Sequence, residues 1–207
     1  MKLRYRPEID GLRAIAVFSV IIYHAKFFFN EKVFLKGGFI GVDIFLVISG
    51  YLITSLILKE YKQTNFFSYK YFYERRARRI LPALLFIIIV SSVIAYLFLL
   101  PLSFVDFAYS SISSILFSSN IYFWATGIEY AATSELYRPL LHTWSLSIEE
   151  QFYIVFPIFL IFLLKNFERN ILKIVIFFFI ISLIFATYGN NKFQSLNFYI
   201  IFSRGWE

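Results

Sequence analysis

Five long apolar runs limit what this chain can fold into. They lie at residues 13–29, 38–58, 80–100, 145–164 and 171–188. A helix needs about 20 mostly apolar residues to cross the hydrocarbon core of a bilayer, and each run reaches or approaches that length. The pattern predicts an all-α fold, a polytopic transmembrane helical bundle.

Composition supports the same class of protein. Of the 207 residues, 59% are hydrophobic and 16% are charged, whereas soluble domains are roughly half apolar and a quarter charged. Cysteine is absent and only His24 and His142 are histidines. Disulfides and thiolate metal sites are therefore excluded, no metal is expected, and we expect no soluble domain within residues 1–207.

Basic residues predict the orientation of the first spans. They precede the first span and fill the loop between the second and third spans, so both segments, and the N-terminus, belong in the cytoplasm. These residues are Lys2, Arg4, Arg6, Lys59, Lys62, Lys70, Arg75, Arg76, Arg78 and Arg79. The net charge of +7 is explained by such loops beside a lipid bilayer, and no nucleic acid partner is expected.

A serine-rich segment at 107–125 leaves the later topology open. If it spans, the loop 126–143 is cytoplasmic, although Arg138 is the loop's only basic residue. If it dips into the membrane or lies at its surface, that loop is outside and the basic residues after the next span are inside. Charge favours the second version, which gives about five spans plus one re-entrant or interfacial segment.

Two ionisable residues inside spans are candidates for function, because such groups are costly in lipid. His24 lies five residues before the end of the first span, and Asp43 lies five residues after the start of the second. At 1.5 Å per residue both sit about 7–8 Å below the outer surface. Equal depth predicts a His–Asp pair in which the carboxylate fixes the imidazole tautomer and leaves a base or nucleophile. The alternative is a polar pair that only holds two helices together.

Four arginines in "FYERRARRILP", residues 72–82, form the next candidate site. Arg76 and Arg79 are three residues apart, so they share a helix face and can converge on one anion. Arg13 lies at the same membrane face. The alternative is an anchor that faces lipid head groups.

The stretch "RPLLHTWSLSIEEQFYIVFP", residues 138–157, also groups polar side chains. Ser147 and Glu150 fit a capping box at a helix start. Glu149 and Glu150 are neighbours about 100° apart on a helix, so they cannot form a facing catalytic pair. His142, Trp144 and Tyr153 are expected to form an interfacial belt at the membrane surface, with no further role.

Several motifs recur together, in order, over nearly the whole chain. They are "YRPEIDGLRAIAV", "YHA", "GGFIGVDIFLVISGYLIT", "FYERRARRILPAL", "LHTWSLSIEEQFY" and "SRGWE". Together they resemble the acyltransferase-3 family of bacterial membrane O-acyltransferases. The fifth motif is similar to the branch that often carries an SGNH-type domain and includes peptidoglycan and lipopolysaccharide O-acetyltransferases.

The resemblance implies a reaction and a set of roles. An acetyl group would move from cytosolic acetyl-CoA, the acyl donor, to a hydroxyl of an extracytoplasmic cell-envelope glycan, across the bacterial cell (inner) membrane. His24 matches the family's essential histidine, with Asp43 in its glycine-flanked second-helix motif. Arg13, Arg76 and Arg79 match arginines proposed to hold the CoA phosphates. The residues assigned to substrate binding are Ser49, His142, Trp144, Glu149 and Glu150.

Length is where the chain departs from the family. Family members have more spans, so we expect residues 1–207 to be the N-terminal part of one membrane domain, with the missing C-terminal half as a further partner. Two alternatives stay open: a truncated, inactive remnant, or a transporter-like protein whose His24–Asp43 pair relays protons. The acceptor glycan and the identity of the short acyl group are not predicted.

Overall fold

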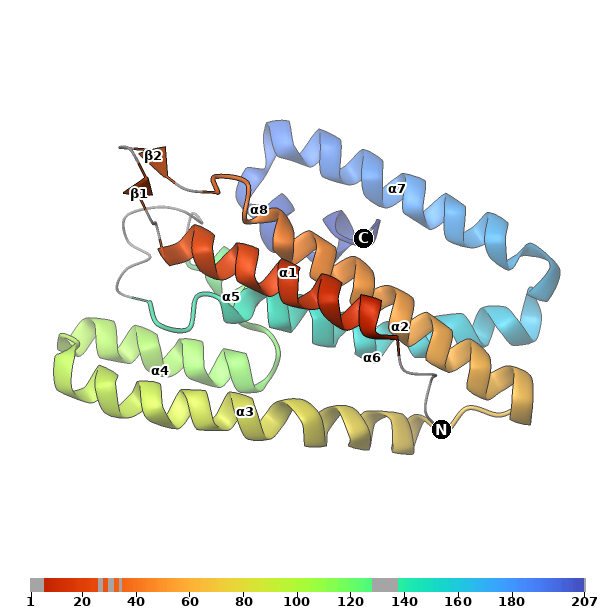
Figure 1. The fold of residues 1–207 in the computed structure, drawn as a ribbon, viewed down its shortest axis with the longest axis horizontal. Helices are drawn as coiled ribbons and strands as arrows, with labels where there is room; N and C mark the ends of the chain where they lie inside the picture. Colours follow the sequence, from red (N-terminus) through yellow and green to blue (C-terminus); the bar gives the residue numbers. More distant parts are fainter. Residues whose placement is uncertain (1–5, 26–27, 30–31, 34, 128–137, 207) are drawn as a thin grey trace. The chain divides into compact units, whose positions relative to one another are not determined.

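The computed structural model describes residues 6–25, 28–29, 32–33, 35–127 and 138–206 (Figure 1). The chain divides into two compact units, one ending at Phe67 and the other formed by Ser68–Trp206. The regular structure is helical apart from β1 (Phe28–Phe29) and β2 (Lys32–Val33), two short strands that pair antiparallel. The all-α prediction is confirmed.

Within the described residues, four helices are long and apolar enough to cross a membrane. They are α2 (Ile40–Thr64), α3 (Tyr69–Phe98), α6 (Thr143–Asn166) and the stretch Glu168–Gly189, which holds most of α7 (Ile171–Lys192). They coincide with four of the five predicted spans and confirm a polytopic membrane bundle.

The predicted first span falls on α1 (Pro7–Ala25), which is not one of these four. This helix has 19 residues, and its first two turns include Glu8, Asp10 and Arg13. Its apolar part is therefore shorter than the roughly 20 residues that a span needs. The predicted span ran from residue 13 to 29, whereas the helix begins at Pro7, in the charged segment, and ends at Ala25.

In the first unit, two glycines let α1 and α2 pack closely. A Cβ atom at Gly38 would overlap the Ser19 carbonyl oxygen and lie 2.7 Å from Tyr23 Cβ. A Cβ atom at Gly41 would likewise overlap the Ala16 carbonyl oxygen. Small residues at such contacts let helix backbones approach each other in membrane proteins. These glycines of "GGFIGVDIFLVISGYLIT" therefore serve helix packing.

The second unit begins with α3 and α4 (Pro101–Ile115), which lie side by side as a hairpin (Figure 1). Its apolar core combines residues of α3, α4 and the segment before α6. The core residues are Leu84, Ile88, Ala95, Phe107 and Leu140.

The serine-rich segment is a broken helix. The chain leaves α4 after Ile115, adopts a positive φ of 51° at Phe117, and starts α5 (Ser119–Ala125). Neither piece is long enough to span, which agrees with a re-entrant or interfacial segment. Within a membrane, a break of this kind is tolerated when protein groups bind the freed backbone atoms.

Side chains of α6 bind the backbone at this break. The Gln151 amide donates from Nε2 to the Phe117 carbonyl oxygen at 2.8 Å, and the Ser119 N–H donates to Ser147 Oγ at 3.2 Å. Ser119 and Ser147 also join through their hydroxyls at 2.8 Å. The break is thus held by two side chains one helical turn apart on α6.

The chain then turns at the 3₁₀ helix η2 (Glu168–Asn170), runs through α7, and folds back through α8 (Gln194–Tyr199) and η3 (Ile201–Ser203). Ser182 Oγ on α7 donates to the Phe202 carbonyl at 2.7 Å, and Asn197 Nδ2 donates to the Ala186 carbonyl at 2.9 Å. These bonds attach the last described residues to α7.

Candidate functional site

The predicted site residues divide between the two units. Arg13, His24, Asp43 and Ser49 belong to the first, and the remaining predicted site residues belong to the second. Those of the second unit are Arg76, Arg79, His142, Trp144, Glu149 and Glu150.

The four arginines near the start of α3 have different surroundings. Arg75 lies over the Tyr71 ring, with Cζ 4.1 Å from its centroid, and Arg78 pairs with Glu74 at 2.6 Å. Both partners come four residues earlier on the same exposed helix face. Arg75 and Arg78 are therefore engaged within α3.

Arg76 instead connects α3 to α6. Its Cζ lies 4.6 Å from the Tyr153 ring centroid and 5.8 Å from that of Phe72. Tyr153 donates its hydroxyl hydrogen to Glu149 Oε1 in a short hydrogen bond. Glu149 is 9% exposed and Glu150 6% exposed, and both carboxylates act electrostatically on the Arg76 guanidinium. Buried carboxylates need such a positive partner, so Arg76 compensates the acidic pair.

Arg79 shares the predicted helix face but not this environment. Its side chain is exposed, while its charge acts on both Arg76 and Glu150. The predicted pair thus consists of one inward-facing and one outward-facing guanidinium. Arg79 is the member that an anion approaching from solvent can contact.

Residues 143–153 of α6 make polar contacts on two different faces of the helix. Ser147 and Gln151 face the broken helix, whereas Glu149 and Tyr153 face Arg76. The predicted capping box is wrong, because α6 already begins at Thr143 and Ser147 lies in its second turn. The Ser147 hydroxyl is bonded to Ser119.

The predicted interfacial belt is also wrong for two of its three members. Trp144 and Tyr153 are buried, and Trp144 packs against Phe198 with ring centroids 4.4 Å apart. The Arg204 guanidinium lies over the Trp144 ring at 5.4 Å. Only His142 of the three has an exposed side chain.

In the first unit, paired contacts define how α1 and α2 align. Arg6 Nη1 donates to the Tyr51 hydroxyl at 2.8 Å, and Arg13 Cζ lies 5.5 Å from the Phe45 ring centroid. Gly41 meets Ala16 and Val20. As the α1 number rises the α2 number falls, so the helices are antiparallel, as predicted.

This alignment contradicts the predicted equal depth of His24 and Asp43. Gly41 lies opposite the stretch between Ala16 and Val20, which puts Asp43 opposite the neighbourhood of Ala16. His24 is eight residues further along α1, a rise of about 12 Å at 1.5 Å per residue. The prediction assumed helix ends at 29 and 38, whereas α1 ends at Ala25. The backbone levels of the two residues therefore differ, while the His24–Asp43 pair and a catalytic role of Asp43 stay predictions.

His24 is half-buried in the last turn of α1. Its Nδ1 atom lies 2.9 Å from the Val20 carbonyl oxygen, four residues earlier. The neighbouring Tyr23 ring stands edge-on to the imidazole at 5.0 Å and to the Phe39 ring at 5.8 Å. Ser49, the residue of this unit that was predicted to bind substrate, is buried in α2.

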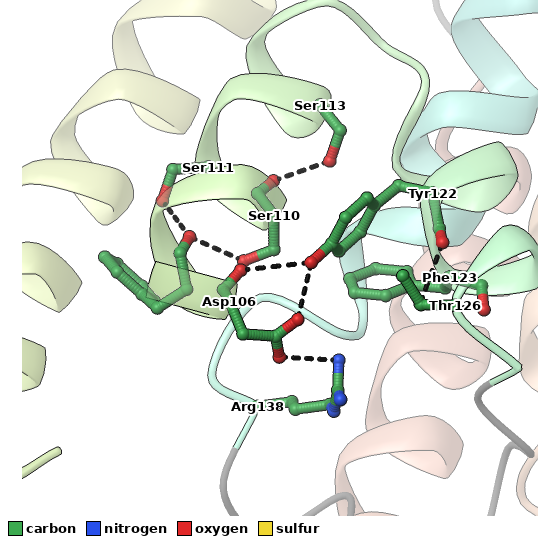
Figure 2. Close-up of polar contacts among 9 residues, drawn as sticks. Asp106, Ser110, Ser111, Ser113, Tyr122, Phe123, Thr126 and Arg138 are labelled. Atoms are coloured by element: carbon green, nitrogen blue, oxygen red, sulfur yellow. Dashed lines mark hydrogen bonds and ion pairs between the residues drawn. The ribbon is translucent and has the colours of Figure 1, made fainter. Parts of the chain in front are cut away.

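A polar cluster that the sequence did not predict joins α4, α5 and the segment before α6. Figure 2 shows Tyr122 and Arg138 converging on the Asp106 carboxylate. Tyr122 donates to Asp106 Oδ1 at 2.5 Å, and Arg138 Nη1 lies 2.7 Å from Oδ2. Burial, and then the bond to Asp106, raises the pKa of Tyr122 to about 12. The sequence feature that could have indicated this cluster is Asp106, the only charged residue between 101 and 125.

No group of His, Cys, Asp or Glu side chains suited to a metal ion occurs in the part of the chain that the structure describes. The candidate groups are an imidazole, a carboxylate and a guanidinium in the first unit, and two guanidinium groups and a buried carboxylate pair in the second.

Comparison with known proteins identifies the protein family. The acyltransferase-3 family model, described as an acyltransferase domain, matches residues 6–206. The chain belongs to the acyltransferase-3 family. "O-acetyltransferase OatA" of Staphylococcus aureus strain NCTC 8325 is 43% identical over 182 residues, which cover 87% of this chain and 28% of OatA. A relative from strain MSSA476 is 45% identical over 169 residues, 82% of this chain and 27% of the relative.

This acyltransferase-3 chain spans less than a third of the length of these relatives. No solved structure gives a significant match to it. Family membership makes the chain an acyltransferase domain built on membrane helices.

Proposed function

We propose that this domain serves O-acetylation, in which an acetyl group moves from cytosolic acetyl-CoA to a hydroxyl of an extracytoplasmic cell-envelope glycan. The observation that carries the proposal is the family match over residues 6–206, together with a relative named as an O-acetyltransferase. The expected location is the bacterial cell (inner) membrane. Basic residues before α1 and around the start of α3 favour a cytoplasmic N-terminus.

The geometry of α1 supports a donor that lies along this helix. Arg13 and His24 are eleven residues apart in one unbroken helix, which corresponds to about 16 Å at 1.5 Å per residue. An extended pantetheine arm is suited to this span. The CoA phosphates would lie near Arg13, and the thioester would lie near His24.

In the second unit, Arg79 is assigned to the donor phosphates because its guanidinium is exposed. Guanidinium groups bind phosphate oxygens through paired donors. Arg76 adds positive charge from the buried side, next to Glu149 and Glu150.

The acceptor would be bound by the other predicted residues. The residues proposed to bind it remain Ser49, His142, Trp144, Glu149 and Glu150. Peptidoglycan and lipopolysaccharide both offer suitable hydroxyls. A C-terminal portion, as in the longer relatives, is proposed as a partner in presenting the acceptor.

In this scheme His24 acts as a general base. It removes the proton of the glycan hydroxyl while the hydroxyl oxygen attacks the acetyl carbonyl carbon and the carbon–sulfur bond of the thioester breaks. The CoA thiolate leaves and takes up the proton from the imidazolium. The products are the acetylated glycan and CoA, and His24 returns to its neutral form.

The alternative of a proton-relaying transporter relies on a His24–Asp43 pair. The match of residues 6–206 to an acyltransferase domain favours acyl transfer over that alternative.

Acetyl transfer from radiolabelled acetyl-CoA to a glycan acceptor, measured in membranes that contain the protein, tests the proposal. His24→Ala should lower the transfer rate by at least about 100-fold, because it removes the general base, while the amount of protein in the membrane stays the same. Undiminished transfer by this variant would reject the proposal.

The same assay tests the donor site. Arg79→Ala should raise the KM for acetyl-CoA, because it removes an exposed phosphate contact. Arg78→Ala is the matched control, since Arg78 is engaged by Glu74 on the same helix and should leave the KM unchanged. An equal KM in all three proteins would mean that Arg79 is a topology anchor only.

A further inference from the structure

Asp106 joins three segments of the second unit through one carboxylate (Figure 2). Asp106 lies in α4, and its Oδ1 atom accepts the hydroxyl hydrogen of Tyr122 in α5 at 2.5 Å. Its Oδ2 atom lies 2.7 Å from Arg138 Nη1, in the segment before α6. An ionised carboxylate has acceptor sites on both oxygens, so it can bind two donors at once. The segment before α6 is therefore attached to both α4 and α5 at a single side chain.

The ion pair between Asp106 and Arg138 is half-buried. The side chain of Arg138 is 25% exposed and that of Asp106 is 30% exposed. Salt and water screen such a pair less than they screen a pair of fully exposed charges. Neutralising one partner leaves the other as a partly desolvated charge without compensation. The pair therefore holds the two segments together more firmly than a surface ion pair would.

Arg138 starts a run of turns that leads into α6. The Leu141 N–H donates to the Arg138 carbonyl at 3.0 Å, and the Thr143 N–H donates to the Leu140 carbonyl at 3.0 Å. Leu140 and Leu141 are buried, whereas His142, the next residue, is exposed. The position of His142 thus depends on how the residues before and after it are held.

The other end of this run also contacts α4 and α5. Thr143 Oγ1 lies 2.8 Å from Ser114 Oγ and 2.9 Å from Ser119 Oγ. The segment 138–143 is therefore attached at both ends, by an ion pair at Arg138 and by hydroxyl groups at Thr143. His142 lies between these two attachments.

The ion pair is remote from the proposed donor site. Phe107, next to Asp106, belongs to the same apolar core as Ala95 of α3. Ala95 is 16 residues beyond Arg79 in this helix, about 24 Å at 1.5 Å per residue. In the proposed topology Arg79 is on the cytoplasmic side and Asp106 is toward the outer side. A change at Asp106 can therefore alter acceptor binding without altering donor binding.

We propose that Asp106 and Arg138 are positioning residues, whose ion pair holds the segment 138–143 against α4 and so places His142 for the acceptor. This inference rests on the proposed function, in which His142 is one of the residues that bind the acceptor. Asp106 acts through Arg138, and Arg138 acts through the backbone of the segment that it starts. The pair thus determines how tightly the acceptor binds and leaves the binding of acetyl-CoA unchanged.

The first test measures the position of residue 142 directly. Spin labels are attached to Leu102→Cys, at an exposed position of α4, and to His142→Cys, since the natural sequence contains no cysteine. Pulsed electron paramagnetic resonance in lipid nanodiscs then gives the distribution of distances between the labels. We expect one narrow distribution, which should broaden or shift when Asp106→Asn is added.

Glu74→Gln is the matched control for this measurement. It also removes a carboxylate that pairs with an arginine, but the Glu74–Arg78 pair lies within α3, so the distribution should stay narrow. An unchanged distribution in Asp106→Asn, or an equal change in Glu74→Gln, overturns the positioning role. The measurement needs no substrate, so its failure is distinct from failure of the proposed function.

The second test separates acceptor binding from donor binding. Acetyl transfer from radiolabelled acetyl-CoA to soluble peptidoglycan fragments is measured in membranes with equal amounts of each protein. Asp106→Asn and Arg138→Gln should each raise the KM for the fragments about 10-fold, because the acceptor-binding residue is misplaced. The KM for acetyl-CoA should not change. Arg138→Lys keeps the positive charge and should raise the KM for the fragments less than Arg138→Gln does.

The exchanged pair, Asp106→Arg with Arg138→Asp, restores opposite charges and should return the KM for the fragments toward the wild-type value. If Arg138→Lys is no better than Arg138→Gln and the exchanged pair restores nothing, Arg138 contacts the acceptor itself and the positioning role is overturned. An unchanged KM for the fragments in Asp106→Asn, or an equal rise in the KM for acetyl-CoA, also overturns it. Absence of transfer by the wild-type protein would instead reject the proposed function.

Discussion

Single residues at the α1–α2 contact decide how the first unit is built. Gly38 and Gly41 leave room for carbonyl oxygens of the facing helix, and Arg13 lies over Phe45 one turn further along α2. These contacts fix the alignment of His24, at the end of α1, with the start of α2. The position of the imidazole therefore depends on glycines that are remote from it in sequence.

Gly41→Ala should destabilise the protein. The added Cβ would overlap the Ala16 carbonyl oxygen and lie 2.8 Å from Val20 Cγ2, so the helices must separate. Overpacking of this kind costs about 1–3 kcal/mol, measured here as a lower thermal unfolding midpoint in detergent.

Gly11→Ala is the matched control for this substitution. No atom lies within 4 Å of its added Cβ, and Gly11 lies inside α1. Replacing glycine by alanine in a helix gains roughly 0.5–1 kcal/mol, so the unfolding midpoint should stay or rise. An equal loss in both variants would contradict close packing at Gly41.

At the scale of elements, α6 organises the second unit through its two faces. Ser147 and Gln151 bind the break between α4 and α5, while Tyr153 and Glu149 hold Arg76 of α3. Polar groups of this mostly apolar helix thus satisfy a broken backbone on one face and a charge on the other. The motif "WSLSIEEQFY" combines a structural task with a proposed ligand-binding one.

Gln151→Leu should weaken the α4–α5 break. It leaves the Phe117 carbonyl without the amide that donates to it at 2.8 Å, and a buried carbonyl that loses its donor costs about 1–3 kcal/mol. Gln63→Leu, at an exposed position near the end of α2, is the control and should have little effect. Limited proteolysis between α4 and α5, together with thermal unfolding, measures the difference between the two variants. Equal behaviour of the two variants would show that Gln151 does not hold the break.

The Asp106–Tyr122–Arg138 cluster predicts a loss of stability in alkali. The pKa of Tyr122 rises from 10.0 to about 12 in the folded protein. The stabilisation that the neutral Tyr122 hydroxyl gives to the folded protein is therefore complete below pH 10. It is lost as the pH rises toward 12, because Tyr122 of the unfolded chain ionises first.

Unfolding curves recorded across this pH range test the cluster. The wild-type protein should lose more stability between pH 10 and pH 12 than Tyr122→Phe, which lacks the ionisable hydroxyl. Tyr96→Phe, at an exposed tyrosine of α3, should behave like the wild type. A wild-type curve parallel to that of Tyr122→Phe would show that the cluster does not couple ionisation to folding.

At the scale of the whole molecule, the broken helix determines how often the chain crosses the membrane. Since α4 and α5 are both too short to span, the chain should return to the outer side after α5. The basic loop between α2 and α3 should face the cytoplasm.

Introduced cysteines can test this topology, because the natural sequence contains none. In intact cells a membrane-impermeant maleimide should label Thr126→Cys, just after α5, and should label Lys62→Cys only after permeabilisation. Labelling of both cysteines only after permeabilisation would show that residues 107–125 cross the membrane.

The sequence by itself determined the membrane class, the helical architecture and four of the spans, because these depend on the length and apolarity of local segments. Its motifs also identified the acyltransferase-3 family. Local pattern did not determine the level of His24 relative to Asp43, which depends on where α1 ends and on glycine contacts between helices. Nor did it separate Arg76 from Arg79, because two arginines three residues apart share one helix face. Contacts with α6 half-bury Arg76 and leave Arg79 exposed. Tertiary structure decided these points because each arises from contacts between segments, for which spacing along a single helix carries no signal.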